Sequence, residues 1–318
     1  MKIDNYYPVF ELFYPIFVLH QLLKVIKVMK AVRFIIPKTS TNSFRVQLDK
    51  QPYFYDTIHY HPEHQITYIV KGEGTCFIGN HVERFTAGDV YFIGKNVPHV
   101  FKSDKAYYEG TNGKTSFGIS IFLKDETFGQ QFFEIPEMAH IKRLLDIASM
   151  GVKLLGDDRD KVAQLIFTTK DMNGFQRFQA LMEILDLLAQ SDHLEILSSV
   201  RFDVPSRDSD HERINVVFNY LSGNFTQEIS LDKISSIANM TPNAFCRYFK
   251  NRTGKTFSNF LNEIRVEYAG RMISGSHDSF GNIALESGFN NISYFNRKFK
   301  QITGLTPLMY RRKFGGDG

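Results

Sequence analysis

Cysteine is scarce and tryptophan is absent in this chain of 318 residues, whose two cysteines are Cys76 and Cys246. Two cysteines cannot form a disulfide framework, which excludes the small disulfide-stabilised secreted class and indicates a reducing compartment. We therefore expect a cytoplasmic protein. A hydrophobic fraction of 43% and a charged fraction of 23% exclude a disordered tail, a collagen-like chain and a polytopic membrane protein. At roughly 150 residues per domain, the length predicts about two domains.

Apolar runs long enough to cross a membrane are also lacking. The most hydrophobic stretch, residues 9–28, is interrupted by Glu11 and two lysines, and Pro15 would kink a helix there. No small-residue cleavage site follows, which argues against a secretory signal, so we expect no membrane partner. Residues 1–28 are then an N-terminal extension with two open alternatives. It is a peripheral amphipathic segment, or it is not translated and Met29 is the true start.

The net charge is only +4, but its distribution is uneven. Residues 210–318 contain 14 Lys and Arg against 9 Asp and Glu, whereas residues 1–209 contain 24 against 25. The excess positive charge therefore lies in the last third of the chain, and the rest is nearly neutral.

Short β-rich runs fill residues 29–125, and turns rich in Gly, Asn and Pro separate them, which predicts a sandwich or a barrel. Residues 126–205 change to helical periodicity and form a helical connector. Within it, apolar residues of the segment 174–190 recur at steps of three and four. This stripe is either a packing helix of the core or a dimer seam, so the connector is also the candidate region for a homodimer.

An internal repeat distinguishes residues 206–318. Segments 237–256 and 283–306 match from their ends at a constant offset of 50 residues, which pairs Arg247 with Arg297. Each copy predicts a short helix, a turn and a longer helix, the helix-turn-helix pattern. Phenylalanines four residues apart would bury one face of each longer helix and leave Arg, Lys and Asn on another. Such side chains can read bases in the major groove or neutralise phosphates.

The segment 288–312, GFNNISYFNRKFKQITGLTPLMYRR, closely resembles the signature of AraC/XylS-type transcriptional regulators. The resemblance extends over about 210–314 and implies two recognition helices that enter successive segments of the major groove. Cys246 departs from the polar residue usual at its position, so a role as a small filler beside the helix core stays open for it. The DNA-binding residues that the resemblance implies are Asn243, Cys246, Arg247 and Lys250 in the first helix, and Ile292, Ser293, Asn296, Arg297 and Lys300 in the second.

Residues 59–101 resemble a cupin, with a His-x-His pair, a Gly-Asp before a strand and a Pro-His at the end. Many AraC-type regulators carry such an N-terminal effector-binding barrel. The implied fold class is α+β: a cupin or jelly-roll-like β-barrel at 29–125, the connector at 126–205 and an all-α tandem helix-turn-helix domain at 206–318. The residues that we expect to contact a small-molecule effector are His59, His61, Gln65, Tyr68 and His99.

A metal ion is the alternative occupant of this cluster, because three imidazoles suit zinc, iron or manganese. The metal-binding cupin pattern also needs a Glu four residues after the second His, and Gln65 stands there. A neutral amide is a poor substitute for a carboxylate at a divalent ion. We therefore expect no metal and no cofactor, and a polar effector such as a sugar.

Together these features predict a DNA-binding transcriptional regulator controlled by an effector. Its expected partners are double-stranded DNA, RNA polymerase and a second copy of the chain, and we expect an activator. A cupin enzyme fused to a DNA-binding tail is the first alternative, but its metal-binding carboxylate is missing. The chain also contains no Gly-x-Ser-x-Gly, P-loop or HExxH motif, so we expect no enzyme. The second alternative, a structural helical protein that binds through segment 174–190, does not account for the repeat.

Overall fold

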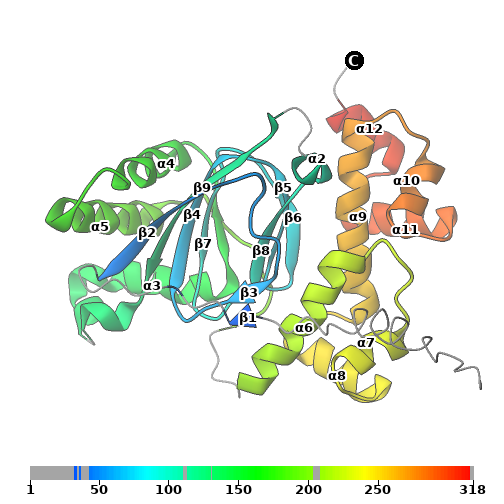
Figure 1. Ribbon diagram of the computed structural model, residues 1–318, viewed down its shortest axis with the longest axis horizontal. Coiled ribbons are helices and arrows are strands. Elements are labelled where there is room, and N and C mark those ends of the chain that lie inside the picture. Colours follow the sequence, from blue (N-terminus) through cyan, green and yellow to red (C-terminus); the bar gives the residue numbers. More distant parts are fainter. Residues whose placement is uncertain are drawn as a thin grey trace, which may run out of the picture.

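The computed structural model shows a layered molecule, in which one group of helices, two β-sheets and a second group of helices follow one another (Figure 1). The N-terminal extension, with its two alternatives, lies outside the described residues. The described residues are 32–33, 36, 43–109, 113–129, 131–202 and 208–315.

The strands form two sheets, each with its own main-chain hydrogen bonds. In spatial order, the first sheet contains β1 (Val32–Arg33), β3 (His59–Tyr60), β8 (His99–Ser103), β5 (Gly74–Ile78) and β6 (His81–Phe85). The second contains β11 (Leu194–Ile196), β10 (Val152–Leu154), β7 (Val90–Ile93), β4 (His64–Lys71), β9 (Ser116–Leu123) and β2 (Phe44–Gln51).

The α+β class and the cupin-like pair of sheets are confirmed, but the described strands do not close into the expected barrel. At the edge strand β6, the contact with the second sheet is made by side chains and not by main-chain hydrogen bonds between the described strands. Lys153 Nζ of β10 lies 3.2 Å from Glu83 Oε1 of β6 and 3.1 Å from Asp89 Oδ2. The ion pair between Glu83 and Lys153 thus connects the two sheets at a place where no main-chain hydrogen bonds join the described strands.

Side chains alternate between the two faces of each strand, and both faces are covered. Inward-facing residues such as Cys76 of the first sheet and Tyr91 and Ile93 of the second form the core between the sheets. Outward-facing residues of the second sheet, such as Ile66 and Phe92, join a separate core beneath helices. This explains why the strands read as nearly continuous apolar runs.

The predicted connector is built into the sheets, because it supplies β10 and β11 as well as helices. In α5 the buried residues include Leu181, Leu185 and Leu188, which pack on the outer face of the second sheet with α3 and α4. The periodic stripe is therefore a core face. The helices before the C-terminal domain are α2 (Lys105–Tyr108), α3 (Ala139–Ile147), α4 (Asp158–Thr169) and α5 (Gly174–Gln190), with short 3-10 turns η2 (Asp125–Phe128), η3 (Phe132–Glu134), η4 (Pro136–Met138) and η5 (Ala148–Met150).

The C-terminal domain is a tandem helix-turn-helix, as predicted. A side-chain N-cap stands at the start of each recognition helix. The Thr241 side chain accepts a hydrogen bond from the main-chain amide of Ala244, and the Asn291 side chain accepts one from the main-chain amide of Tyr294. Among the described residues, no helix combines the length and the apolarity that a membrane crossing requires. The helices are α6 (Asp208–Asn224), α7 (Leu231–Ile237), α8 (Pro242–Thr253), α9 (Phe257–Gly275), α10 (Phe280–Glu286), α11 (Ile292–Thr303) and α12 (Pro307–Phe314).

The outer face of the first sheet is the docking surface for this domain. Phe77 of β5 and Val100 of β8 share one apolar cluster with residues of α6, α7, α8 and α9. A charged contact flanks the cluster, because the Arg271 guanidinium on α9 lies 2.7 Å from an Asp104 carboxylate oxygen. The two domains therefore pack over both apolar and ionic contacts.

Gly288, in the turn before α11, gives a test of the packing within the C-terminal domain. Its φ is +86°, and an added Cβ would lie 2.8 Å from Arg265 Nε and 2.9 Å from two main-chain oxygens. Gly288→Ala should lower the free energy of unfolding by about 2–4 kcal/mol, because backbone strain and the clash add. Gly304→Ala is the control, since φ is +75° there but nothing lies within 4 Å, and it should cost about 1 kcal/mol. Equal shifts in the melting temperature of the two full-length variants would contradict this.

Candidate functional site

The first recognition helix, α8, buries one face and exposes the other. Phe245 and Phe249 are fully buried, at 0% exposure. Asn243, Cys246, Arg247 and Lys250, the predicted DNA-binding residues, are all exposed. A major-groove contact is thus open to all four side chains.

The second recognition helix, α11, repeats this division. Phe295 and Phe299 are buried, and the predicted residues are all exposed, with Ile292 at 49% exposure. The Arg297 guanidinium lies 5.3 Å from the centre of the Tyr294 ring, and the Tyr294 hydroxyl accepts a hydrogen bond from Asn262 of α9 at 2.9 Å. The predicted DNA-binding residues that this helix exposes are Ile292, Ser293, Asn296, Arg297 and Lys300.

Helix α9 joins the two units and sets their spacing. It has 19 residues, which corresponds to a length of about 28 Å. One turn of B-DNA advances by about 34 Å, so a rigid connection of this length suits two successive segments of the major groove.

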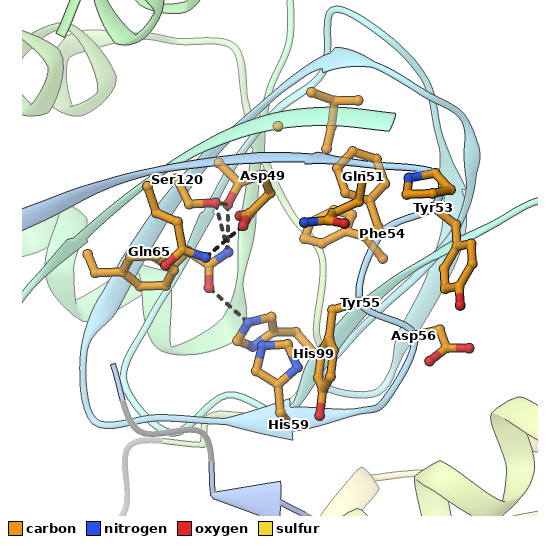
Figure 2. Close-up of a pocket in the computed structure, with 17 residues that line it drawn as sticks. Asp49, Gln51, Tyr53, Phe54, Tyr55, Asp56, His59, Gln65, His99 and Ser120 are labelled. Carbon is orange, nitrogen blue, oxygen red and sulfur yellow. Dashed lines mark hydrogen bonds between the residues drawn. The ribbon is translucent and has the colours of Figure 1, made fainter. Parts of the chain in front are cut away.

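A second candidate site is a cavity of about 700 Å³ on the inner side of the two sheets (Figure 2). Three neighbouring strands supply alternating polar side chains to it, since residues of equal parity share one face. The cavity is lined by Gln47, Asp49, Gln51, Pro52, Tyr53, Phe54, Tyr55, Asp56, His59, Gln65, Thr67, Ile69, His99, Phe101, Gly118, Ser120 and Phe122.

The cavity wall carries negative but no positive side chains among the described residues. Asp49 and Asp56 contribute carboxylates, and no Lys or Arg belongs to the described lining. Burial raises the pKa of Asp49, although a hydrogen bond from Gln47 at 2.8 Å partly offsets this. Such a wall disfavours an anionic ligand and accepts hydrogen bonds from hydroxyl or amino groups.

Three predicted effector residues, His59, His61 and His99, lie close together, and two of them, His59 and His99, line this cavity. In each ring Nδ1 lies 2.8–3.0 Å from the main-chain carbonyl oxygen of a residue two positions away along the chain. A carbonyl only accepts, so each neutral ring carries its proton on Nδ1 and has a lone pair on Nε2. One ring nitrogen from each of the three histidines lies within 4.8 Å of the others. Burial lowers the pKa of His59 to about 4 and that of His99 well below its usual value.

The Gln65 amide lies against two of these lone pairs. Its Oε1 is 2.9 Å from His61 Nε2 and 3.0 Å from His99 Nε2, and its Nε2 is 2.7 Å from Thr67 Oγ1. Three acceptors without a proton cannot bind one another. Either a cation lies among them, or the amide is rotated by 180°, so that its NH2 donates to both rings and its oxygen accepts from hydroxyls.

Charge decides between these two arrangements. The environment that lowers the pKa of the buried histidines also penalises a divalent cation, unless an anionic ligand, such as the carboxylate of the metal-binding cupin pattern, offsets its charge. Gln65 stands where that carboxylate would be. The nitrogen atoms are thus placed as in a metal site, but the charge is not compensated. The rotated amide pairs the lone pairs of His61 and His99 without a cation.

The predicted effector residues do not all share one site. His59, Gln65 and His99 line the cavity, whereas His61 contacts Gln65 from behind. The structure places Tyr68 on the opposite face of β4, where it packs against the core beneath the helices. Positions 65 and 68 differ by an odd number, so they cannot face the same side of one strand. Tyr68 therefore lies outside this cavity.

Sequence reasoning also missed one wall of the cavity. Gln47, Asp49 and Gln51 alternate along β2 and point into it, as Asp49 and Gln51 do in Figure 2. Their spacing of two residues is visible in the sequence FRVQLDKQ. That pattern indicates a polar face but not which space the face encloses.

Comparisons with known proteins agree with this architecture. The family profile described as a helix-turn-helix domain matches residues 234–313, and the profile described as a cupin domain matches residues 50–106. The chain therefore contains an AraC-type helix-turn-helix domain and a cupin domain. Both resemblances stated from the sequence are thereby confirmed.

Several known proteins are similar to this chain in sequence or in structure. The probable transcriptional regulator LumQ of Photobacterium leiognathi is 25% identical over 277 residues, which cover 85% of this chain and 97% of LumQ. An uncharacterized HTH-type transcriptional regulator of Staphylococcus aureus is 22% identical over 250 residues, covering 77% of this chain. The chain matches only 31% of the length of that relative. Among solved structures, ToxT from Vibrio cholerae is 13% identical, with 86% of this chain and 99% of ToxT covered and a TM-score of 0.34.

Measurement of bound metal tests the proton arrangement in this cupin domain. The purified full chain should carry no stoichiometric divalent metal, and a chelator should leave its melting temperature unchanged. Gln65→Glu should bind about one Zn²⁺ or Co²⁺ per chain, because its carboxylate offsets the charge of the ion. Gln47→Glu, which adds the same charge on another strand, is the control and should not. Elemental analysis after dialysis measures all three. Stoichiometric metal in the unsubstituted chain that His61→Ala removes would contradict this arrangement.

Proposed function

We propose that this chain is a transcriptional regulator that binds DNA sequence-specifically and whose DNA binding a small molecule in the cupin cavity controls. The observation that carries the proposal is the exposure of both recognition helices on a domain that packs against the sheet behind the cavity. The AraC-type family supports the DNA-binding half of it.

Base recognition follows from the chemistry of the exposed side chains. Arg247 and Arg297 occupy equivalent positions in the two units and can each donate two hydrogen bonds to guanine. Asn296 can pair with adenine, and Ile292 can contact a thymine methyl group. Lys250 and Lys300 of the two helices neutralise phosphates.

The composition of the cavity favours a neutral polyhydroxylated effector, such as a sugar. Hydroxyl groups can donate to Asp49 and Asp56 and exchange hydrogen bonds with Gln51, His59 and the other polar residues of the wall. Tyrosine rings at the cavity mouth offer stacking surfaces in place of the absent tryptophan. The volume of about 700 Å³ is ample for one such ligand.

The remaining parts of the proposal concern partners and compartment. We place the protein in the cytoplasm, as an activator that contacts RNA polymerase, without enzymatic activity. We also propose a homodimer. The apolar stripe of α5 is buried in the core, so it is not the dimer surface. The surface that we propose for contact with a second copy is the aromatic end of α5, where Phe175 is 70% exposed and stacks on Phe178.

Selection of duplexes from a random DNA library should yield a preferred sequence for the full chain. Arg247→Ala and Arg297→Ala should each weaken binding to that duplex by about 1–3 kcal/mol and relax the base preference locally. Fluorescence anisotropy at several salt concentrations measures both effects, and the affinity should fall steeply with salt.

Lys142→Ala on α3 is the matched control, because it removes an exposed cation far from the recognition helices and should leave the affinity unchanged. Equal affinity of the unsubstituted chain for the selected duplex and for a scrambled one would rule out sequence-specific binding.

A thermal-shift screen tests the effector half. A ligand that binds the folded state raises the melting temperature. At least one neutral sugar or polyol should do so. Organic anions should not, because the cavity wall carries carboxylates and, among the described residues, no positive side chain. Asp49→Asn should weaken the shift, since it replaces a charged acceptor in the wall. Tyr68→Phe, on the outer face of the same sheet, should not. A shift caused only by anions, or one unaffected by Asp49→Asn, would contradict the assignment.

A further inference from the structure

The segment of residues 52–58, between β2 and β3, has two different neighbours. Five of its residues in sequence, from Pro52 to Asp56, line the cavity. Figure 2 shows Tyr53, Tyr55 and Asp56 along one side of it. Asp56 also lines a second hollow, of about 400 Å³, between the cupin and the C-terminal domain. This segment is therefore a wall between the cavity and the domain interface.

The end of the segment is docked on α6. The main-chain amide of Ile58 donates to Asn219 Oδ1 at 2.6 Å, and Asn219 Nδ2 donates to the Ile58 carbonyl at 3.1 Å. Both residues are buried, with exposures of 1% and 3%. Loss of this side-chain amide would leave two buried main-chain groups unpaired, at a cost of about 1–3 kcal/mol each. The position of the segment and that of α6 are thus coupled.

From α6 the contact continues to the first recognition helix. Phe218, the neighbour of Asn219 in sequence, lies in the same apolar cluster as Ile58 and has its ring centre 6.2 Å from that of Phe249 in α8. Phe249 is on the buried face of α8, and Arg247 is on the exposed face. Movement of α6 relative to the sheet therefore changes how α8 is held.

We propose that segment 52–58 transmits effector binding to the first helix-turn-helix unit, through the pair of hydrogen bonds between Ile58 and Asn219. This rests on the proposed function, since it assigns the regulation of the same cavity. A ligand that contacts Tyr53 and Tyr55 changes the free energy of the contact between Ile58 and Asn219. That change alters the preferred position of α6 and α8. Coupling is reciprocal, so DNA bound at α8 changes the stability of the segment in the same way.

Reciprocity allows a test before the effector is known. The full chain is followed by hydrogen–deuterium exchange with and without the DNA duplex selected above. Amide exchange in the peptide that contains residues 52–60 should change by about fivefold or more when DNA binds. A peptide from α5, on the far side of the second sheet, should not change.

Two substitutions on the same interface isolate the proposed contact. Asn219→Ala should still bind the duplex, but exchange in residues 52–60 should no longer respond to it. Lys102→Met is the matched control, because Lys102 Nζ donates to the Ser222 carbonyl of the same helix at 2.8 Å from outside the segment. That variant should keep the response.

The outcomes separate this inference from the proposed function. If the duplex binds but exchange at 52–60 in the unsubstituted chain is unchanged, the coupling role is wrong while DNA binding stands. A response that persists in Asn219→Ala also overturns it. If no duplex binds specifically, the proposed function fails and this inference fails with it. The measurement on the unsubstituted chain does not depend on whether the alanine variant folds.

Discussion

Alternation of side chains along the strands is the constraint on which the rest of this structure depends, because both sheets are covered on both faces. The inner faces form the core and the cavity. The outer face of the second sheet carries α3, α4 and α5, and that of the first sheet carries the C-terminal domain. In β8, for example, His99 points into the cavity while Val100 packs toward the DNA-binding helices. Ligand cavity and docking surface are thus opposite faces of one sheet.

Buried polar groups give this arrangement its specificity, since each needs a defined partner. Gln65 is central in the cavity, because its amide bridges two histidines to the hydroxyl groups of Thr67 and Ser120. Asn219 has the corresponding role at the domain interface, where one side-chain amide pairs with both main-chain groups of a single residue. Segment 52–58 lies between them, because it lines the cavity and ends at the contact between Ile58 and Asn219.

The C-terminal domain was predictable because its signals are local. Phenylalanines four residues apart and caps such as Thr241 act within one helix, and a repeat doubles the signal. The cavity was only partly predictable. The residue spacing of a cupin motif pointed to His59, Gln65 and His99, whereas Asp49 on β2 was missed because the pairing of that strand is not local. The three-residue strands of the connector are too short to show any periodicity.

By itself, the sequence determined the two domains, the helix-turn-helix pair and the side chains that each recognition helix exposes, because 3.6-residue periodicity and capping act over a few residues. Only the tertiary structure decided which polar residues surround one cavity, that Tyr68 faces away from it, and that the apolar stripe of α5 is buried. It also decided that Ile58 meets Asn219. These facts depend on strand pairing and packing between residues up to 161 positions apart, which no local pattern specifies.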